Sequence, residues 1–344
     1  MDPKNIIIRM PNWLGDAVMG TPVIADLRRH WPDAKITVMS LRSVGSILEH
    51  DPNIDELFTF QRPSGWIHRS HVRNILMPLR HGHYDLGVLL TNSFSSCWWF
   101  WRGHVENRIG FACNFRSPFL NYAVPFPKNK ESQHQVITYK MLLEPLGMPV
   151  SDTDPQLYVT EKEKQTARDL LCLYGISPKN RVIGINPGAA YGSAKCWLPE
   201  RFQEVTRRLL ENKDMYILYF GDANGASLVE KICQNMPERV INLAKKTNLR
   251  EFMALITLCD AFLSNDSGPM HLCAALGIPL LALFGSTSDV KTGPYKFGTV
   301  LHKHAPCSPC YLRNCPIDFR CMKEISSEEV YQSLMGLLNA KSNV

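Results

Sequence analysis

The sequence predicts an α/β protein made of two doubly wound domains, each a parallel sheet with helical crossovers. The chain has 344 residues, which corresponds to about two domains of ordinary size. Its apolar runs alternate between strand-like and helix-like periodicity, most regularly from Lys179 onwards. A turn-rich passage between Gly147 and Ser177 separates two such halves.

The N-terminal half opens with a βαβ unit. An apolar strand over 5–10 is followed by a helical stretch over 16–30 and by a second strand over 35–40. Pro22 should kink the helical stretch, or restart it with proline in the first turn. A Leu- and Val-rich run over 85–91 predicts another buried strand.

The C-terminal half alternates more regularly. Strands are predicted over 182–186, 215–220, 240–242, 261–264 and 278–284, and helices over 161–174, 199–212, 223–234, 249–259 and 268–276. Strands separated by helices form parallel sheets with right-handed crossovers. We therefore place the N-terminal domain at 1–165 and the C-terminal domain at 166–344, and leave open that the last helix packs back on the N-terminal domain.

The composition is that of a globular protein, with 45% apolar and 20% charged residues. Its longest apolar runs, 278–284 and 97–101, fall far short of the roughly 18 residues that cross a bilayer. The apolar start before Arg9 is too short for a signal peptide, so we expect a cytoplasmic protein. The net charge of +6 favours anionic partners such as phosphates, nucleic acid or an acidic membrane surface, although a generic solvated surface explains it equally well.

Four of the eleven cysteines cluster near the C-terminus. The spacing C-x2-C-x4-C-x5-C of Cys307, Cys310, Cys315 and Cys321 would allow four thiolates to hold a zinc ion. Structural zinc sites usually contain two closely spaced pairs, and this segment has one. Reduced thiols that pack in loops are therefore favoured over a metal site.

Ligands of open α/β sheets bind beyond the carboxyl ends of the strands, so the strand-to-helix turns are the candidate sites. The first turn runs from Asn12 to Asp16 and contains a glycine that permits a sharp bend. Asp16 fits an N-cap, and it would equally serve as a general base if it faced a cleft.

The second turn, over 186–197, is rich in small residues and carries one lysine, Lys195. Small residues let the backbone approach a phosphate, and lysine supplies a mobile positive charge. Lys195 stands too late for a P-loop, and no G-x-G-x-x-G lies near a strand. Hydride transfer with NAD or FAD is therefore disfavoured.

The third turn, over 264–271, reads S-N-D-S-G-P-M-H. Its small residues, with proline near the first helical turn, expose free amides and the positive end of a helix dipole, which suits a diphosphate. Asp266 either caps this helix or hydrogen-bonds neutral sugar hydroxyls. His271 fits a ligand contact or a buried helical histidine about equally well.

Several motifs occur together and in order. They are N-W-x-G-D after the first strand, N-P-G-x(6)-K-x-W after a central strand, and S-N-D-S-G-x-M-H followed by F-G-S-T and T-G-P. The segments Asn92–Phe94, Arg108–Phe111, His134–Gln135 and Cys307–Cys310 accompany them. Over nearly the whole chain this set resembles glycosyltransferase family 9, and most closely the members that add the second heptose of lipopolysaccharide.

The resemblance implies a GT-B architecture, in which two Rossmann-like domains face each other across a cleft. The N-terminal domain would bind the acceptor and the C-terminal domain the nucleotide sugar. The implied reaction is an inverting transfer of L-glycero-D-manno-heptose from ADP-heptose to the first heptose of the lipopolysaccharide inner core, on a heptosylated Kdo-lipid A acceptor.

The resemblance also assigns roles to individual residues. Asp16 matches the catalytic base, Lys195 the catalytic and diphosphate-binding lysine, and Asp266 the donor-sugar aspartate. The diphosphate cradle would be formed by Ser267, Gly268, Met270 and His271, with serine at 267 where several members have threonine. The nearest candidates for the ribose and adenine contacts are Gly221 and Asp222, and those for the acceptor are Asn12, Asn92 and Ser93.

Lysine and backbone amides can neutralise a diphosphate, so we expect that no metal or other cofactor is required and that Mg²⁺ at most stimulates turnover. The apolar stretch over 93–102 either packs in the core or faces lipid or acceptor sugars. A basic stretch is available to phosphate or carboxylate groups: Arg62, His68, Arg69, His71, Arg73, Arg80 and His81. Both features would fit peripheral contact with the cytoplasmic face of the inner membrane.

Two other functions are weighed against this one. Within the family, the chain would be heptosyltransferase I or a later core sugar transferase. Outside it, the chain would be a non-catalytic zinc-bearing module that binds nucleic acid through its basic surface. The sequence shows no RNP, KH or helix-turn-helix pattern, so no nucleic-acid partner is expected.

Overall fold

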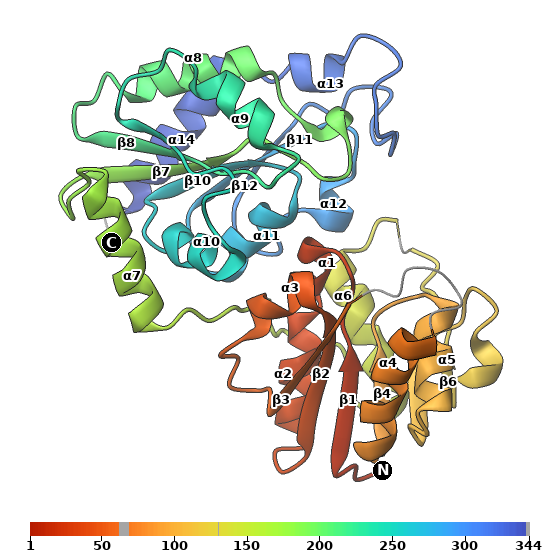
Figure 1. The fold of residues 1–344 in the computed structure, drawn as a ribbon. Coiled ribbons are helices and arrows are strands. Elements are labelled where there is room, and N and C mark those ends of the chain that lie inside the picture. Colours follow the sequence, from red (N-terminus) through yellow and green to blue (C-terminus); the bar gives the residue numbers. More distant parts are fainter. Residues whose placement is uncertain (62–68, 130, 342–344) are drawn as a thin grey trace. The chain divides into compact units, whose positions relative to one another are not determined.

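A computed structural model describes residues 1–61, 69–129 and 131–341, and the side chains of residues 69–71 are outside that description. The chain divides into two compact units, Met1–Tyr158 and Val159–Val344 (Figure 1). Helix α7 (Glu161–Leu173), which begins just after the division, belongs to the second unit. Its first turn is closed by a capping box in which Thr160 and Glu163 bond each other's backbone amides.

The first unit is a six-stranded parallel sheet of order β3-β2-β1-β4-β5-β6. Its strands are β1 (Asn5–Arg9), β2 (Lys35–Leu41), β3 (Glu56–Phe60), β4 (Leu86–Leu89), β5 (Asn107–Phe111) and β6 (Tyr122–Val124). Its α-helices are α1 (Leu14–Met19), α2 (Thr21–His30), α3 (Arg42–Gly45), α4 (Arg69–His81), α5 (Phe94–Arg102) and α6 (Gln135–Lys140). Short 3-10 helices η1 (Ser46–Leu48), η2 (Ser117–Phe119) and η3 (Met141–Leu146) complete it.

The helical stretch predicted over 16–30 is two helices, α1 and α2, which meet at Gly20. A Cβ atom at Gly20 would lie 2.9 Å from Cδ1 of Leu90, so a larger residue here would have to displace the side chain of Leu90, which follows β4. Pro22 stands in the first turn of α2. The prediction that proline would restart the helix is thus confirmed.

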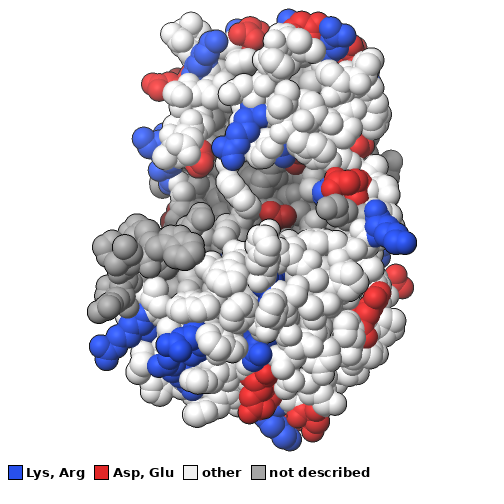
Figure 2. Space-filling view, turned by 90° about the vertical axis from the view of Figure 1, so that its right-hand side faces the viewer, with Lys and Arg blue, Asp and Glu red and all other residues white. Residues whose placement is uncertain are grey.

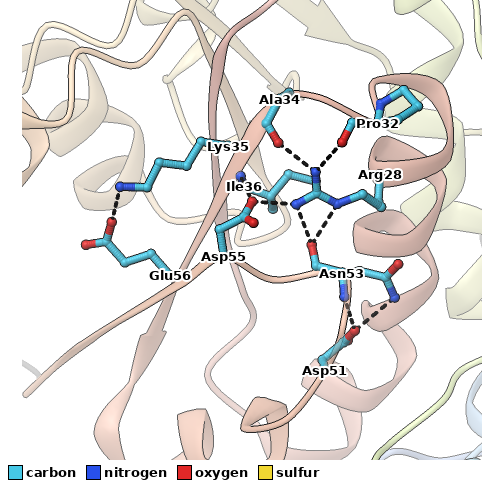
Figure 3. Close-up of polar contacts among 9 residues, drawn as sticks. All are labelled: Arg28, Pro32, Ala34, Lys35, Ile36, Asp51, Asn53, Asp55 and Glu56. Atoms are coloured by element: carbon cyan, nitrogen blue, oxygen red, sulfur yellow. Dashed lines mark hydrogen bonds and ion pairs between the residues drawn. The ribbon is translucent and has the colours of Figure 1, made fainter.

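The connection between β2 and β3 is fixed by the guanidinium of Arg28, which reaches out from α2 (Figure 3). Arg28 donates to the carbonyls of Pro32 at 2.8 Å and Ala34 at 2.7 Å, and also to the carboxylate of Asp55. Asp55 in turn accepts from the backbone amide of Ile36 at 2.7 Å. One side chain therefore satisfies polar groups of two segments at the amino-terminal edge of the sheet, the turn before β2 and the loop before β3.

The second unit is also a six-stranded parallel sheet, of order β12-β11-β10-β7-β8-β9. Its strands are β7 (Arg181–Asn186), β8 (Met215–Tyr219), β9 (Val240–Asn242), β10 (Ala261–Asn265), β11 (Leu280–Phe284) and β12 (Thr299–His302). Besides α7, its helices are α8 (Pro199–Leu209), α9 (Ala226–Cys233), α10 (Leu249–Ile256), α11 (Gly268–Ala275), α12 (Asp289–Thr292), α13 (Arg320–Lys323) and α14 (Ser327–Lys341), with the 3-10 turn η4 (Ser193–Lys195).

Helices cover both faces of the second sheet, with α8, α9 and α14 on one side and α10 and α11 on the other (Figure 1). The central strands β10 and β11 are buried along their whole length, as expected for parallel strands covered on both faces. The sequence left open a return of the last helix to the first domain. The side chains that α14 buries, Val330, Leu334 and Leu338, lie instead in the core of the second unit.

The elements predicted in the C-terminal half are all present, with ends that differ by at most a few residues. The edge strand β12 and the short helices α12 and α13 were not predicted, and the last helix, α14, was expected without stated bounds. Among the described residues, no helix combines the length and the apolar character needed to cross a membrane.

Candidate active site

The candidate donor site lies at the carboxyl edge of the second sheet. Strands β7, β10 and β11 are direct neighbours in the order of that sheet, so the loops that leave their carboxyl ends meet there. The loop after β8 is also close, because a Cβ atom at Gly188 would lie 3.9 Å from the Cα of Gly225. Residues about 80 positions apart in the sequence therefore share one edge.

Lys195 and Asp266 meet at this edge. The ammonium Nζ of Lys195 lies 2.5 Å from the carboxylate Oδ2 of Asp266, and their side chains are only 13% and 4% exposed. The hydroxyl of Thr287, from the loop after β11, donates to the same carboxylate oxygen. The sequence analysis assigned these two charged residues separate roles, and the structure places them in one buried ion pair.

The loop that carries Lys195 is held by amide side chains at the strand ends. Asn265, the last residue of β10, donates to the carbonyl of Pro187 at 2.6 Å and accepts from the amide of Trp197 at 3.1 Å. Asn186, the last residue of β7, donates to the carbonyl of Gly188 at 2.9 Å. These bonds span the start and end of the loop and fix its path past the sheet.

The same loop is tied to the cysteine-containing segment. A Cβ atom at Gly192 would lie 2.3 Å from the carbonyl oxygen of Arg313, so the two backbones are in direct contact. The hydroxyl of Tyr191 donates to the carbonyl of Tyr311 at 2.7 Å. The ring of Tyr191 lies beneath two cations, with Nζ of Lys195 at 5.1 Å and Cζ of Arg313 at 5.4 Å from its centroid.

Helix α11 begins at this edge without a side-chain cap. Its N-cap residue is Ser267, whose hydroxyl lies 3.0 Å from that of Ser264 and accepts from Asn186 at 3.3 Å instead of bonding the helix amides. Gly268 is half-buried, whereas Met270 and His271 are buried. Pro269 has no amide hydrogen and the amide of Met270 bonds the carbonyl of Ser267 at 3.1 Å, so what this turn offers an anion is chiefly the positive end of the helix dipole.

Asp222, the predicted ribose contact, has a local structural role. Its Oδ1 accepts from the amides of Asn224 at 3.1 Å and Gly225 at 2.8 Å, which closes the turn before α9. Asp222 is exposed and Gly221 half-buried, after β8. Their nucleotide role stays a prediction.

Asp16 lies in the first unit, in the first turn of α1 and half-buried. The N-cap of this helix is Trp13, so the structural alternative that Asp16 is the N-cap is wrong. The reason is that the helix starts earlier than predicted, at Leu14. Burial, and then the negative charge of Asp16, raise the pKa of Tyr139 in α6 well above its usual value.

Arg9, at the carboxyl end of β1, was missed by the sequence analysis. It is 2% exposed and donates to the side chain of Asn12 at 2.5 Å and to the carbonyl of Met10. Its Cζ lies 4.8 Å from the ring centroid of Phe60, and burial lowers its pKa to about 9. The arginine therefore orients Asn12, one of the predicted acceptor residues. The only sequence signal for Arg9 is its position directly before the first strand-to-helix turn.

Asn92 and Ser93 follow β4, the neighbour of β1. Asn92 is exposed, and its side chain accepts from the fully buried Arg116 at 3.3 Å. Ser93 caps α5 by accepting from the amide of Ser96 at 3.3 Å. Both residues lie at the carboxyl edge of the first sheet, as does Asn12.

Helix α5 fits both predictions for the apolar stretch. Cys97, Trp99 and Phe100 are buried in the core of the first unit. Phe94 and Trp101 are 38% and 43% exposed, although each also packs edge-on against Phe119. Most of this helix is therefore core, and two aromatic residues remain at the surface.

The four clustered cysteines lie near one another, but the described residues hold no preformed set of three thiols with metal-ligand spacing among them. Cys307 and Cys310 are exposed, Cys315 is half-buried and Cys321 is buried. Burial, followed by the neighbouring thiols, raises the pKa of Cys321.

The basic stretch is described only in part. Arg62 and His68 lie outside the described residues, as do the side chains of Arg69 and His71. In α4, Arg80 donates to the carbonyl of Arg102 at 3.2 Å, and Nδ1 of His81 lies 2.7 Å from the carbonyl of Met77. On the face drawn in Figure 2, basic and acidic side chains are interspersed among uncharged ones.

Comparison with known proteins gives the family. Residues 72–319 match the model of glycosyltransferase family 9 (heptosyltransferase). The chain is 30% identical to lipopolysaccharide heptosyltransferase 2 of Salmonella typhimurium over 84% of this chain and 85% of the relative. It is 28% identical to lipooligosaccharide heptosyltransferase 2 of Campylobacter jejuni over 97% of this chain and 98% of the relative.

Solved structures agree with these relatives. ADP-heptose lipopolysaccharide heptosyltransferase II of Escherichia coli superposes with a TM-score of 0.83 at 26% identity, covering 98% of this chain and 99% of that one. A family 9 glycosyl transferase of Veillonella parvula shares the fold with a TM-score of 0.86 at 24% identity, over 98% and 97% of the two chains. The predicted GT-B class of two Rossmann-like domains is confirmed. The chain belongs to glycosyltransferase family 9, the heptosyltransferase family.

Proposed function

We propose that this chain transfers L-glycero-D-manno-heptose from ADP-heptose to the first heptose of the lipopolysaccharide inner core, with inversion at the anomeric carbon. The observation that carries the proposal is the buried pair of Lys195 and Asp266 beside the uncapped start of α11. Relatives named heptosyltransferase 2, which align with most of this chain, support the choice of donor and acceptor.

The donor site fits an anionic leaving group. An ammonium group has three N–H donors, so Lys195 can bond Asp266 and still donate to a diphosphate oxygen. The start of α11 adds the positive end of a helix dipole. Together they would stabilise the negative charge that develops on ADP as its bond to the anomeric carbon breaks.

Asp266 would hold Lys195 in place and accept from a hydroxyl of the donor sugar. The carboxylate is fixed from a second direction by Thr287, so it keeps its orientation when the lysine turns towards a diphosphate. This arrangement explains an acidic group beside an anion site, because the acid orients the cation that binds the anion.

Asp16 would act as the general base. As the acceptor oxygen bonds to the anomeric carbon, its hydroxyl proton passes to the Asp16 carboxylate, and ADP leaves with the electron pair of the broken bond. Asn12 and Asn92, at the same edge of the first sheet, are the proposed acceptor contacts, and Arg9 and Arg116 orient their amides. The reaction requires the two units to bring both substrates together.

The proposed chemistry routes no step through a metal ion, so turnover should persist in chelator, with Mg²⁺ acting at most as a stimulant. We also propose that the enzyme works at the cytoplasmic face of the inner membrane. The exposed rings of Phe94 and Trp101 support peripheral contact there, because aromatic side chains favour the membrane interface.

The deciding experiment is mass-spectrometric detection of product. The purified protein is mixed with ADP-heptose and a deacylated core acceptor that ends in one heptose, with ADP-glucose and a heptose-free acceptor as controls. A gain of one heptose on the heptose-bearing acceptor alone supports the proposal. Transfer to the heptose-free acceptor, or transfer of glucose, would instead identify another activity of the same family.

A further inference from the structure

A second polar cluster lies near the carboxyl end of β12. This strand lies next to β11, which leads to Thr287. It consists of Asp289, His302 and His304, and one ligand atom of each lies within 4.8 Å of the other two. Asp289 opens α12, His302 ends β12 and His304 follows two residues later. None of these residues has a part in the proposed transfer reaction.

Both ring nitrogens of His302 have polar neighbours. Ser308 donates its hydroxyl hydrogen to the carbonyl of Gly285 and its Oγ lies 2.9 Å from Nε2 of His302, where it can accept from that ring nitrogen. Nδ1 of the same ring lies 3.0 Å from a carboxylate oxygen of Asp289. Two groups that can ligate a metal ion therefore face each other.

A hydrogen bond between His302 and Asp289 would account for these two side chains alone. The position of the third side chain favours a metal ion. Nε2 of His304 lies 3.9 Å from the second carboxylate oxygen of Asp289, and the two imidazole rings have centroids 4.0 Å apart. A proton shared by His302 and Asp289 gives His304 no reason to be there.

The distances suit a tetrahedral dication. Metal bonds of about 2.0–2.1 Å at a tetrahedral angle place ligand atoms roughly 3.3 Å apart, between the separations of 3.0 Å and 3.9 Å seen here. The side chains of His302 and Asp289 are 2% and 22% exposed, whereas that of His304 is 67% exposed. Two ligands are thus held in place, and the third lies where an ion can enter.

The surroundings also fit. Metal-bound histidines usually donate the other ring N–H to a neighbour, and Ser308 Oγ, 2.9 Å from Nε2 of His302, is placed to accept such a bond. Lys303, which lies between the two histidines, is paired with Glu329 and so directs its charge away from Asp289. The first turn of α12 is held by Ser288, which accepts from the amide of Lys291 at 3.3 Å.

We propose that Asp289, His302 and His304 bind a first-row transition-metal dication of the Zn²⁺ class. Two imidazoles and one carboxylate select such ions over Mg²⁺, which prefers oxygen ligands alone. Three protein ligands leave a coordination position for water or an anionic oxygen. The ion would fix the start of α12, two residues after Thr287, and the inference does not depend on the proposed function.

The test uses Co²⁺ as a spectroscopic probe and Zn²⁺ as its competitor. The full chain carries Cys307→Ser and Cys310→Ser, which removes two of the four clustered thiols as competing ligands. We expect one Co²⁺ per chain, visible absorption without the intense near-ultraviolet band of cobalt thiolates, and displacement by Zn²⁺. Asp289→Asn and His304→Asn should each weaken binding at least about tenfold.

Asparagine is chosen at 304 because this residue has φ 47°, a conformation that asparagine tolerates. His83 is an exposed histidine of the first unit with φ 44°, so His83→Asn is a matched control and should bind Co²⁺ as the parent does. Equal thermal unfolding temperatures of all variants without metal would show that the substitutions do not cause misfolding. Absence of Co²⁺ binding, or full affinity in both Asp289→Asn and His304→Asn, would overturn the proposal.

Discussion

The ion pair of Lys195 and Asp266 makes a quantitative prediction about stability. At a separation of 2.5 Å and an effective dielectric constant of about 20, the attraction is roughly 7 kcal/mol. Removing two ions from water costs several kcal/mol each, so the intact pair contributes little net stability. Breaking it by changing one partner is different, because a buried charge then stays behind.

We expect Lys195→Met to lower the free energy of unfolding by about 3 kcal/mol. Loss of one partner from a buried pair typically costs about 3–5 kcal/mol, and Thr287 still donates to Asp266, which places the value at the lower end. Asp266→Asn should cost about 2 kcal/mol, because the lysine is slightly more exposed than the carboxylate. The double variant has neither charge and should lose only about 1–2 kcal/mol.

The assay is urea unfolding followed by circular dichroism for the parent, both single variants and the double variant. We expect a coupling energy of about 3 kcal/mol, with the double variant more stable than the sum of the two single effects would make it. The exposed pair of Lys231 and Glu200, 3.6 Å apart with side chains 66% and 68% exposed, is the control and should couple by less than about 1 kcal/mol. Additive single effects at Lys195 and Asp266, within about 0.5 kcal/mol, would refute the reasoning.

Three further predictions concern catalysis, the lysine loop and pH. Asp16→Asn should lower kcat about 10²-fold while ADP affinity in calorimetry stays unchanged, and near-normal turnover would remove Asp16 from the mechanism. Gly192→Ala should weaken ADP binding, because its methyl group would lie 2.3 Å from a carbonyl oxygen; unchanged affinity would mean that the loop position does not matter. Arg250 bonds Glu163 through two nitrogens at 2.8 Å and, with Thr160, lowers the pKa of Glu163 to about 2. Because of this lowered pKa, the ion pair stabilises the fold above about pH 4.3, and that stabilisation is lost as the pH falls towards 2. Arg250→Met should therefore lower the free energy of unfolding by roughly 1–3 kcal/mol at pH 7 and by progressively less in acid. A loss of stability that does not change with pH would contradict the pairing.

The regular βαβ alternation could be predicted because it depends on local periodicity. The strands from β7 to β11 and their helices follow continuous apolar runs and amphipathic stretches, which the sequence shows directly. The break at Gly20 could not be placed, because a single glycine inside a helical pattern does not by itself end a helix. The early start of α1 at Leu14 was missed because its N-cap, Trp13, makes no side-chain cap bond.

The candidate site was predictable as a set of loops but not as a set of contacts. The turns that carry Lys195 and Asp266 follow strand ends, and the sequence places both at one edge of a sheet. Their pairing, with the hydroxyl of Thr287, depends on the strand order, which periodicity alone does not give. The cluster of Asp289, His302 and His304 has no short motif and forms only when β11 and β12 lie side by side.

The anchoring of Trp197 has an optical consequence. The indole is 1% exposed, its backbone amide bonds Asn265, and its Nε1 donates to the carbonyl of Ile325 at 3.0 Å. All six other tryptophans precede residue 102, so this is the only one in the second unit. The difference in fluorescence between the protein and a Trp197→Phe variant therefore isolates a single rigid emitter, two residues from Lys195. That emitter reports on the half of the molecule that we propose binds the nucleotide, without any attached dye.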